Sequence, residues 1–170
     1  MFNPNPADMF DLDHGYFYEW GINHDFSGET ISNVRLTFTN INNWWPEPNM
    51  LFMHMMDNMA QGLYVGTDSN PDIVDYFAGQ GTFIDAWEDT NGGPRGDQVN
   101  LTYDFRSMGL LDEFASYAAD GNVGFAFDPD CHFWNDKVTL MVVTDAPEPT
   151  TILLFAMGLV GGVVRKKFKS

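Results

Sequence analysis

The side chains best suited to binding a ligand lie in one acidic stretch, residues 128–136. They are Asp128, Asp130, Asn135 and Asp136. Calcium takes about six to eight hard oxygen ligands, and a short loop can supply several of them. Asp11 and Asp13 precede the first predicted strand and would complete the shell if the first and last strands lie side by side. The spacing does not match an EF-hand loop, so a solvated acidic turn is the alternative interpretation.

Other chemistry is less well supported by the residue pattern. Structural zinc sites use closely spaced Cys and His ligands, whereas this chain has a single cysteine, Cys131, and four scattered histidines. Cys131 and His132 are neighbours in a strand-like hairpin, where successive side chains diverge, which also disfavours a Cys–His nucleophile. With 24 acidic residues, the sequence selects no carboxylate pair for glycoside hydrolysis. We therefore predict a protein that is not an enzyme, with a small carbohydrate-active enzyme on a jelly-roll scaffold as the alternative.

Trp44 and Trp45 stand together in a loop rich in Asn and Pro, residues 42–49. Indole rings offer flat apolar faces to sugars, and neighbouring polar side chains suit hydroxyl groups. Trp134 and Tyr76, in other loops, are the next candidates after this pair. The two tryptophans are thus the predicted polysaccharide-binding residues, and the alternative is that both rings fold back to cap the core.

Short strands separated by turns would position these residues. Residues 31–41 alternate clearly, with Val34, Leu36 and Phe38 predicted to face the core. Further strands are predicted at 14–22, 50–57, 63–67, 81–87, 99–106, 122–127 and 138–144, and one helix at 110–120. This pattern predicts an all-β domain over residues 13–145, an antiparallel β-sandwich of jelly-roll or galactose-binding-like type.

Charge divides the chain into an acidic body and a basic end. All 24 acidic residues lie within residues 1–149, together with only four of the eight basic ones, so this part has a formal charge of −20. Such a body attracts cations and repels nucleic acid and anionic lipid. No basic patch supports nucleic-acid binding, and we exclude nucleic acid as a partner.

The last 25 residues differ in composition from the rest. Pro147, Glu148 and Pro149 are followed by an uncharged apolar run at 152–164 and then by the basic residues Arg165, Lys166, Lys167 and Lys169. Extended by Thr150 and Thr151 and by snorkelling basic side chains, the run approaches the minimum length of a membrane helix, which we predict through residues 150–168. The basic residues predict that this end stays cytoplasmic and that the body lies outside.

This order of Pro-Glu-Pro, short apolar helix and basic cluster resembles the PEP-CTERM sorting signal of exported proteins in Gram-negative bacteria. The resemblance covers residues 146–170. It implies handling by exosortase, a membrane-embedded cysteine transpeptidase-like enzyme that acts near Pro147–Pro149. It also implies transient anchoring in the inner membrane before transfer to the cell surface or an exopolysaccharide matrix. Residues 1–12 lack the basic and apolar parts of a signal peptide, so we expect the true start to lie upstream.

Overall fold

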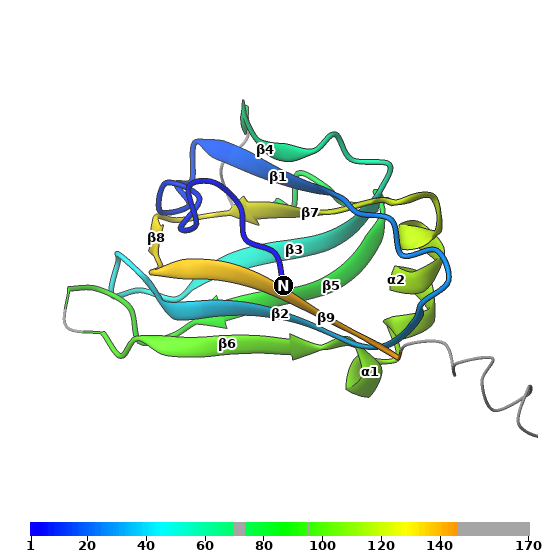
Figure 1. Cartoon of the computed structure of the whole chain (residues 1–170). Helices are drawn as coiled ribbons and strands as arrows, with labels where there is room; N and C mark the ends of the chain where they lie inside the picture. The colour runs from blue at the N-terminus through cyan, green and yellow to red at the C-terminus, as the bar shows by residue number, and fades with distance from the viewer. Residues whose placement is uncertain (70–73, 95, 146–170) are drawn as a thin grey trace, which may run out of the picture.

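The computed structural model describes residues 1–69, 74–94 and 96–145, which form two antiparallel sheets (Figure 1). The five-stranded sheet has the order β4-β1-β7-β3-β5, namely Gly62–Thr67, Tyr16–Asn23, Asn122–Pro129, Asn49–Asp57 and Thr82–Asp89. In the second sheet, β6 (Val99–Asp104), β8 (Phe133–Trp134) and β9 (Lys137–Asp145) all pair with β2 (Thr30–Asn43). The predicted antiparallel β-sandwich is confirmed.

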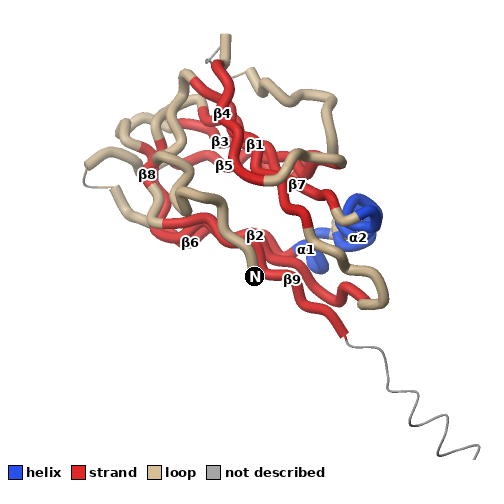
Figure 2. The backbone as a smooth tube through the Cα atoms, turned by 45° about the horizontal axis from the view of Figure 1, so that its top comes forward, coloured by secondary structure: helices blue, strands red, loops and turns tan. Residues whose placement is uncertain are grey.

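Short helices close one end of the sandwich, and loops gather at the other end around β8 (Figure 2). The helices are α1 (Phe105–Met108) and α2 (Leu111–Tyr117), and the 3-10 turn Ala118–Asp120 follows α2. The strand predicted at 99–106 is two residues too long, because the chain turns into α1 at Phe105. Asp104 caps this helix by accepting a hydrogen bond from Ser107 N at 3.1 Å.

The core lies between the two sheets. Val34, Leu36 and Phe38 of β2 are fully buried, as their alternation predicts. Phe38 meets Phe127 of β7 edge to face, with ring centroids 5.4 Å apart, so an aromatic pair joins the sheets. At one side of the sandwich, Tyr103 of β6 donates a hydrogen bond to Asp85 of β5 at 2.9 Å.

A β-bulge near Asn40 divides β2 into two parts. Asn40 has a φ of 52°, and the register with β6 shifts between Phe38 and Ile41. Before the bulge β2 pairs with β9, and after it Asn42 and Asn43 pair with β8. Since a bulge bends and twists its strand, it re-aims the end of β2 toward the loops.

The N-terminal residues pack along β9. Phe2 exchanges two backbone hydrogen bonds with Leu140, at 2.8 and 2.9 Å, and Val138 N donates to Ala7 O at 2.7 Å. Met9 and Leu12 are fully buried in the main core. The domain predicted at 13–145 therefore also takes backbone pairing and core side chains from residues 2–12.

Replacing Phe127 with alanine tests this core. Phe127→Ala leaves a cavity between the sheets and should lower the free energy of unfolding by about 3–5 kcal/mol. Phe83→Ala is the matched control, because that ring is 51% exposed on the edge strand β5, and it should cost much less. Urea unfolding measures both variants, and equal losses would contradict the assignment of the core.

Candidate functional site

Trp44 and Trp134 stack on each other at the loop end of the sandwich, where Trp44 is exposed and Trp134 is half-buried. Their ring centroids are 5.7 Å apart, and their planes differ by 15°. His132 stands edge-on to Trp44, with centroids 5.1 Å apart. Trp44 is 48% exposed and Trp45 is 55% exposed, so neither indole folds back to cap the core. We call Trp44, Trp45, His132 and Trp134 the aromatic surface. Tyr76 does not join it.

Tyr76 lies on the outer face of the five-stranded sheet, where it stacks on Phe17 with centroids 4.2 Å apart. Of the two secondary candidates, Tyr76 therefore lies apart from Trp44 and Trp45, whereas Trp134 stacks on Trp44. The difference arises because the loop carrying Tyr76 packs against the sheet through Phe77, which is buried with Phe17 and Ala126.

Hydrogen bonds from buried groups hold the loop that carries Trp44. Asn43 N donates to Asp89 Oδ2 at 2.8 Å, and Asn43 Nδ2 donates to Asp89 O at 3.0 Å. On the other side, Trp44 N donates to His132 O at 2.7 Å. Gly92 lies so close that a Cβ there would collide with the Asn43 side chain, so the packing requires glycine. The loop is thereby fixed to both neighbouring hairpins.

A pocket of about 330 Å³ adjoins the aromatic surface. It is lined by Phe10, Asp13, Tyr16, Tyr18, Val65 and His132, and we call it the aromatic pocket. His132 belongs to both features, so they are continuous. Phe10 and Tyr16 are 65% and 44% exposed. The sequence did not predict Phe10 and Tyr16 as site residues, because no motif or hydrophobic periodicity distinguishes them from other aromatic residues.

Phe10 is presented to the pocket by a turn in an unfavourable conformation. The φ angles of Met9, Phe10 and Asp11 are 53°, 63° and 55°. Left-handed backbone costs roughly 1–2 kcal/mol for each residue with a Cβ, so tertiary contacts must hold it. Such contacts are present, because Phe133 N donates to Leu12 O at 2.8 Å. Strain of this kind concentrates at ligand-binding sites, which favours a binding role for Phe10.

Asp13 places a carboxylate at the aromatic pocket. Its Oδ1 lies 2.9 Å from Nδ1 of His14 and 3.7 Å from Nδ1 of His132. The backbone N–H of Asp13 donates to the Tyr18 hydroxyl at 2.7 Å. Burial raises the pKa of Tyr18 to about 12, so this hydroxyl stays neutral and fixes the position of Asp13.

The four predicted calcium ligands contact different partners. Asp128 Oδ2 accepts from Tyr76 N at 2.7 Å, and Asp130 Oδ1 accepts from Met50 N at 2.6 Å. Both carboxylates thus hold loops against the five-stranded sheet. Burial is the main cause that raises the pKa of each to about 6, and nearby acidic side chains add to it.

Asn135 and Asp136 lie instead beside the N-terminal turn and the bulge of β2. Asn135 N donates to Asp11 Oδ1 at 3.2 Å, so Asp11 does reach this hairpin, as the sequence suggested. Asp136 Oδ2 accepts from Asn40 Nδ2 at 2.6 Å. Among the residues that the structure describes, no three His, Cys, Asp or Glu side chains are grouped as a metal centre requires. Calcium binding stays a prediction.

On the outer face, hydrogen bonds of the buried His54 side chain hold the loop of residues 74–80. His54 is almost fully buried, and its Nε2 lies 2.9 Å from Asp75 Oδ2. The Nδ1 atom of the same ring lies 2.9 Å from the Gln80 carbonyl oxygen. Each nitrogen of His54 therefore contacts the loop, which gives this histidine a structural rather than a ligand-binding place.

These features define a class of protein, an antiparallel β-sandwich with an exposed aromatic surface at its loop end. Solved structures similar to it include the latent aurone synthase (polyphenol oxidase), both recombinantly expressed and from its natural source, each at a TM-score of 0.50 and 8% identity. The alignments cover 87% of this chain but 28% of the enzyme's chain. At this identity the likeness shows the fold alone. No curated protein sequence matches the chain.

The sorting signal specifies the protein further. The PEP-CTERM protein-sorting motif matches residues 145–167, which confirms the prediction made from Pro147, Glu148 and Pro149. The chain thus carries a PEP-CTERM sorting signal, which supports export, sorting by exosortase and a transient membrane-anchored state. The predicted membrane helix, 150–168, lies outside the described residues. Within the described ranges, no helix has both the length and the apolar character needed to cross a bilayer.

The raised pKa of Asp128 predicts how stability depends on pH. An acid whose pKa is higher in the folded state binds more protons when folded, so its contribution to the free energy of unfolding falls as pH rises from about 4 to 6. Asp128→Asn keeps an acceptor for Tyr76 N and removes the buried charge. We expect it to raise the free energy of unfolding at pH 7 by about 1–2 kcal/mol and to flatten the dependence above pH 4.

Urea unfolding at pH 4.5 and pH 7 measures this effect. Asp57→Asn, an exposed position at the end of β3, is the control and should change little. Asp104, whose pKa hydrogen bonds from Asn33 and Arg35 lower to about 2, acts below this window. A loss of stability in Asp128→Asn at pH 7 would show that its charge stabilises the fold.

Proposed function

We propose that the protein acts at the cell surface or in the extracellular matrix as a non-enzymatic, polysaccharide-binding protein, and that the aromatic surface is its binding site. The observation that carries the proposal is the stack of the exposed Trp44 on the half-buried Trp134, with a second exposed indole at the next residue, Trp45. Large apolar rings left in water forgo the free energy of burial, and clusters of them mark sites that a ligand covers.

The rigidity of the aromatic surface supports this proposal. The backbone of Trp44 is bonded to His132, and the preceding Asn43 is bonded to Asp89, so the rings are held in place before a ligand arrives. A preformed site does not have to order its side chains on binding, which lowers the entropic cost of association.

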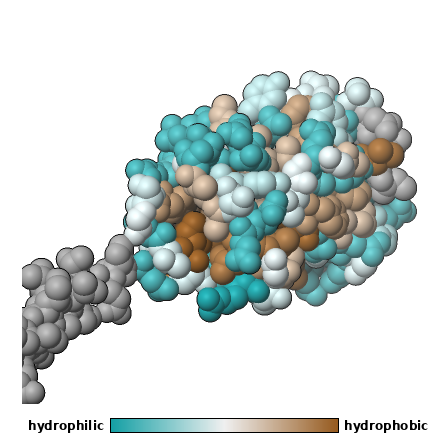
Figure 3. All heavy atoms as spheres, turned by 90° about the vertical axis from the view of Figure 1, so that its right-hand side faces the viewer, coloured by the Kyte–Doolittle hydropathy of each residue, from teal (hydrophilic) through white to brown (hydrophobic). Residues whose placement is uncertain are grey.

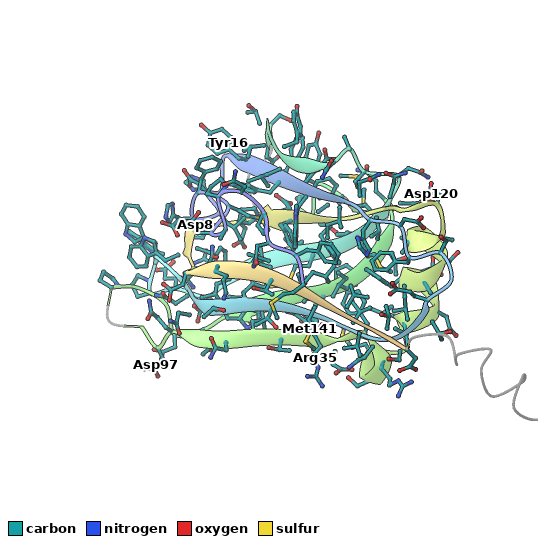
Figure 4. All side chains as sticks on the ribbon, in the orientation of Figure 1. Asp8, Tyr16, Arg35, Asp97, Asp120 and Met141 are labelled. Carbon is teal, nitrogen blue, oxygen red and sulfur yellow. The ribbon has the colours of Figure 1, made fainter. Side chains whose placement is uncertain are left out.

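The position of the aromatic surface within the molecule also supports the proposal. The last described residue, Asp145, pairs with Thr30 near the helical end of the sandwich, and the sorting motif starts there. Figure 3 views that end, where hydrophilic and hydrophobic residues are intermixed. Asp8 and Tyr16 lie at the opposite end from Asp120 (Figure 4). Strand β8, which carries Trp134, also lies at the end opposite the helices (Figure 1), so the aromatic surface and Asp145 are at opposite ends of the sandwich.

A role without catalysis is supported by the use that the fold makes of its unusual acids. Glycoside hydrolysis needs two carboxyl groups that face one substrate. Asp128 and Asp130, whose pKa values are raised to about 6, each accept a backbone amide that secures a loop. These structural hydrogen bonds account for the burial that raises the two pKa values. The raised values therefore do not by themselves indicate a general acid.

Removing one indole tests the binding proposal. Trp44→Ala in the full chain should weaken binding to a soluble polysaccharide about tenfold, because one stacked sugar face is lost, while the melting temperature stays close to that of the wild type. Calorimetry against a panel of neutral, acidic and amino-sugar polymers gives the measurement. Tyr64→Ala is the control, since this exposed ring lies on edge strand β4. Absence of binding across the panel, or an equal loss in both variants, would refute the proposal.

Deleting residues 146–170 tests the proposed final location. When the shortened protein is exported in its native host, we expect none of it in the membrane fraction. We also expect it to be missing from the surface or matrix fraction. The charge-neutral pair Pro147→Ala and Pro149→Ala keeps the apolar run and should block processing while leaving membrane association. Unchanged processing and location after the deletion would remove the support for a sorted matrix protein.

A further inference from the structure

The aromatic pocket indicates which class of polysaccharide the protein binds. We propose that the site takes a glycan with cationic amino-sugar units, and that the ammonium group enters the aromatic pocket beside Asp13 while a neighbouring sugar lies on Trp44. This inference rests on the proposed function and specifies its ligand.

The walls of the pocket suit a cation. Phe10, Tyr16, Tyr18 and His132 contribute rings, and two of these, Phe10 and Tyr16, are substantially exposed. The face of an aromatic ring carries partial negative charge and attracts ammonium groups within about 6 Å. At about 330 Å³ the pocket is at the small end of the range for ligand sites, which is about 300–1,000 Å³. It therefore suits one substituted sugar unit rather than a chain segment.

The charges around the aromatic surface have one dominant sign. A second, polar pocket of about 350 Å³ shares Trp134 with the aromatic surface and is lined by Asp8, Asp11, Asn40, Gln98, Trp134, Asn135 and Asp136. The described residues that line the two pockets include four carboxylates and no Lys or Arg. Among the described residues, the basic side chains that the structure places against Asp13 are His14 and His132, at 2.9 and 3.7 Å.

This arrangement discriminates between classes of glycan. A uronic-acid polymer would bring its carboxylates against those flanking Trp134, and like charges placed opposite each other oppose binding. A neutral polymer would contact the indoles but would gain no charge attraction from Asp13, whose contacts with His14 and His132 would stay as they are. Only a cationic amino sugar uses the stack, the ring faces and the carboxylate together.

A matched pair of ligands tests the inference at pH 7.5 with the full chain. One is the hexamer of N-acetylglucosamine, and the other is the same hexamer with trimethylated amines, whose charge does not depend on pH. Calorimetry should show the charged hexamer binding at least about tenfold more tightly at about 50 mM salt. The advantage should shrink severalfold at about 500 mM salt, because ions screen exposed charges.

Variants locate the effect. Asp13→Asn preserves the shape of the side chain and should abolish most of the charged hexamer's advantage without changing the affinity for the acetylated one. Phe10→Ala should weaken binding of the charged hexamer severalfold. Asp57→Asn makes the same charge change at the far end of β3 and should have little effect, and thermal melting confirms that all three variants are folded.

The remaining outcomes contradict the inference in distinguishable ways. Equal affinity for both hexamers, still reduced by Trp44→Ala, overturns the cationic class and leaves the proposed function intact. Equal losses in Asp13→Asn and Asp57→Asn show attraction to the overall negative charge and overturn the pocket. Binding of neither hexamer nor any other glycan refutes both proposals.

Discussion

Most of the molecule depends on one long strand, β2. It is 14 residues long, and β6, β8 and β9 all pair with it. Its inward face supplies Val34, Leu36 and Phe38 to the core, and its last two residues lead directly into Trp44. Because the same strand forms the second sheet and carries the tryptophan loop, the packing between the sheets also sets the position of the aromatic surface. The bulge at Asn40 separates the part of β2 that builds the core from the part that leads into the tryptophan loop.

The aromatic surface depends in addition on a contact between distant parts of the sequence. The turn at residues 8–13 is bonded to the hairpin at residues 132–136 through Leu12 with Phe133 and Asp11 with Asn135. These bonds keep three consecutive residues in left-handed backbone. The free energy of folding maintains this strained backbone. As a result, Phe10 is held in a fixed and exposed position. The site is thus assembled by tertiary contacts rather than by any local motif.

The acidic character of the body has two different structural consequences. Some carboxylates, such as Asp128 and Asp130, hold loops on the five-stranded sheet. Burying their charged form costs free energy, and this cost is what raises their pKa values. Others, such as Asp13 and Asp136, stay accessible beside aromatic rings. The predicted calcium site combined Asp128 and Asp130 with Asn135 and Asp136. These residues are close in sequence, but sequence distance does not show to which side of a hairpin each side chain points.

The sequence by itself determined the alternation of β2, the antiparallel sandwich and the sorting signal at Pro147–Pro149, since hydrophobic period and local composition are short-range properties. It also identified Trp44 and Trp45 as ring-bearing loop residues. Only the tertiary structure decided that Trp134 stacks on Trp44, that Tyr76 does not, and that Phe10 and Asp13 form a pocket with His132. These pairings join residues more than a hundred positions apart or on different loops, and such contacts follow from how the sheets pack and not from any pattern along the chain.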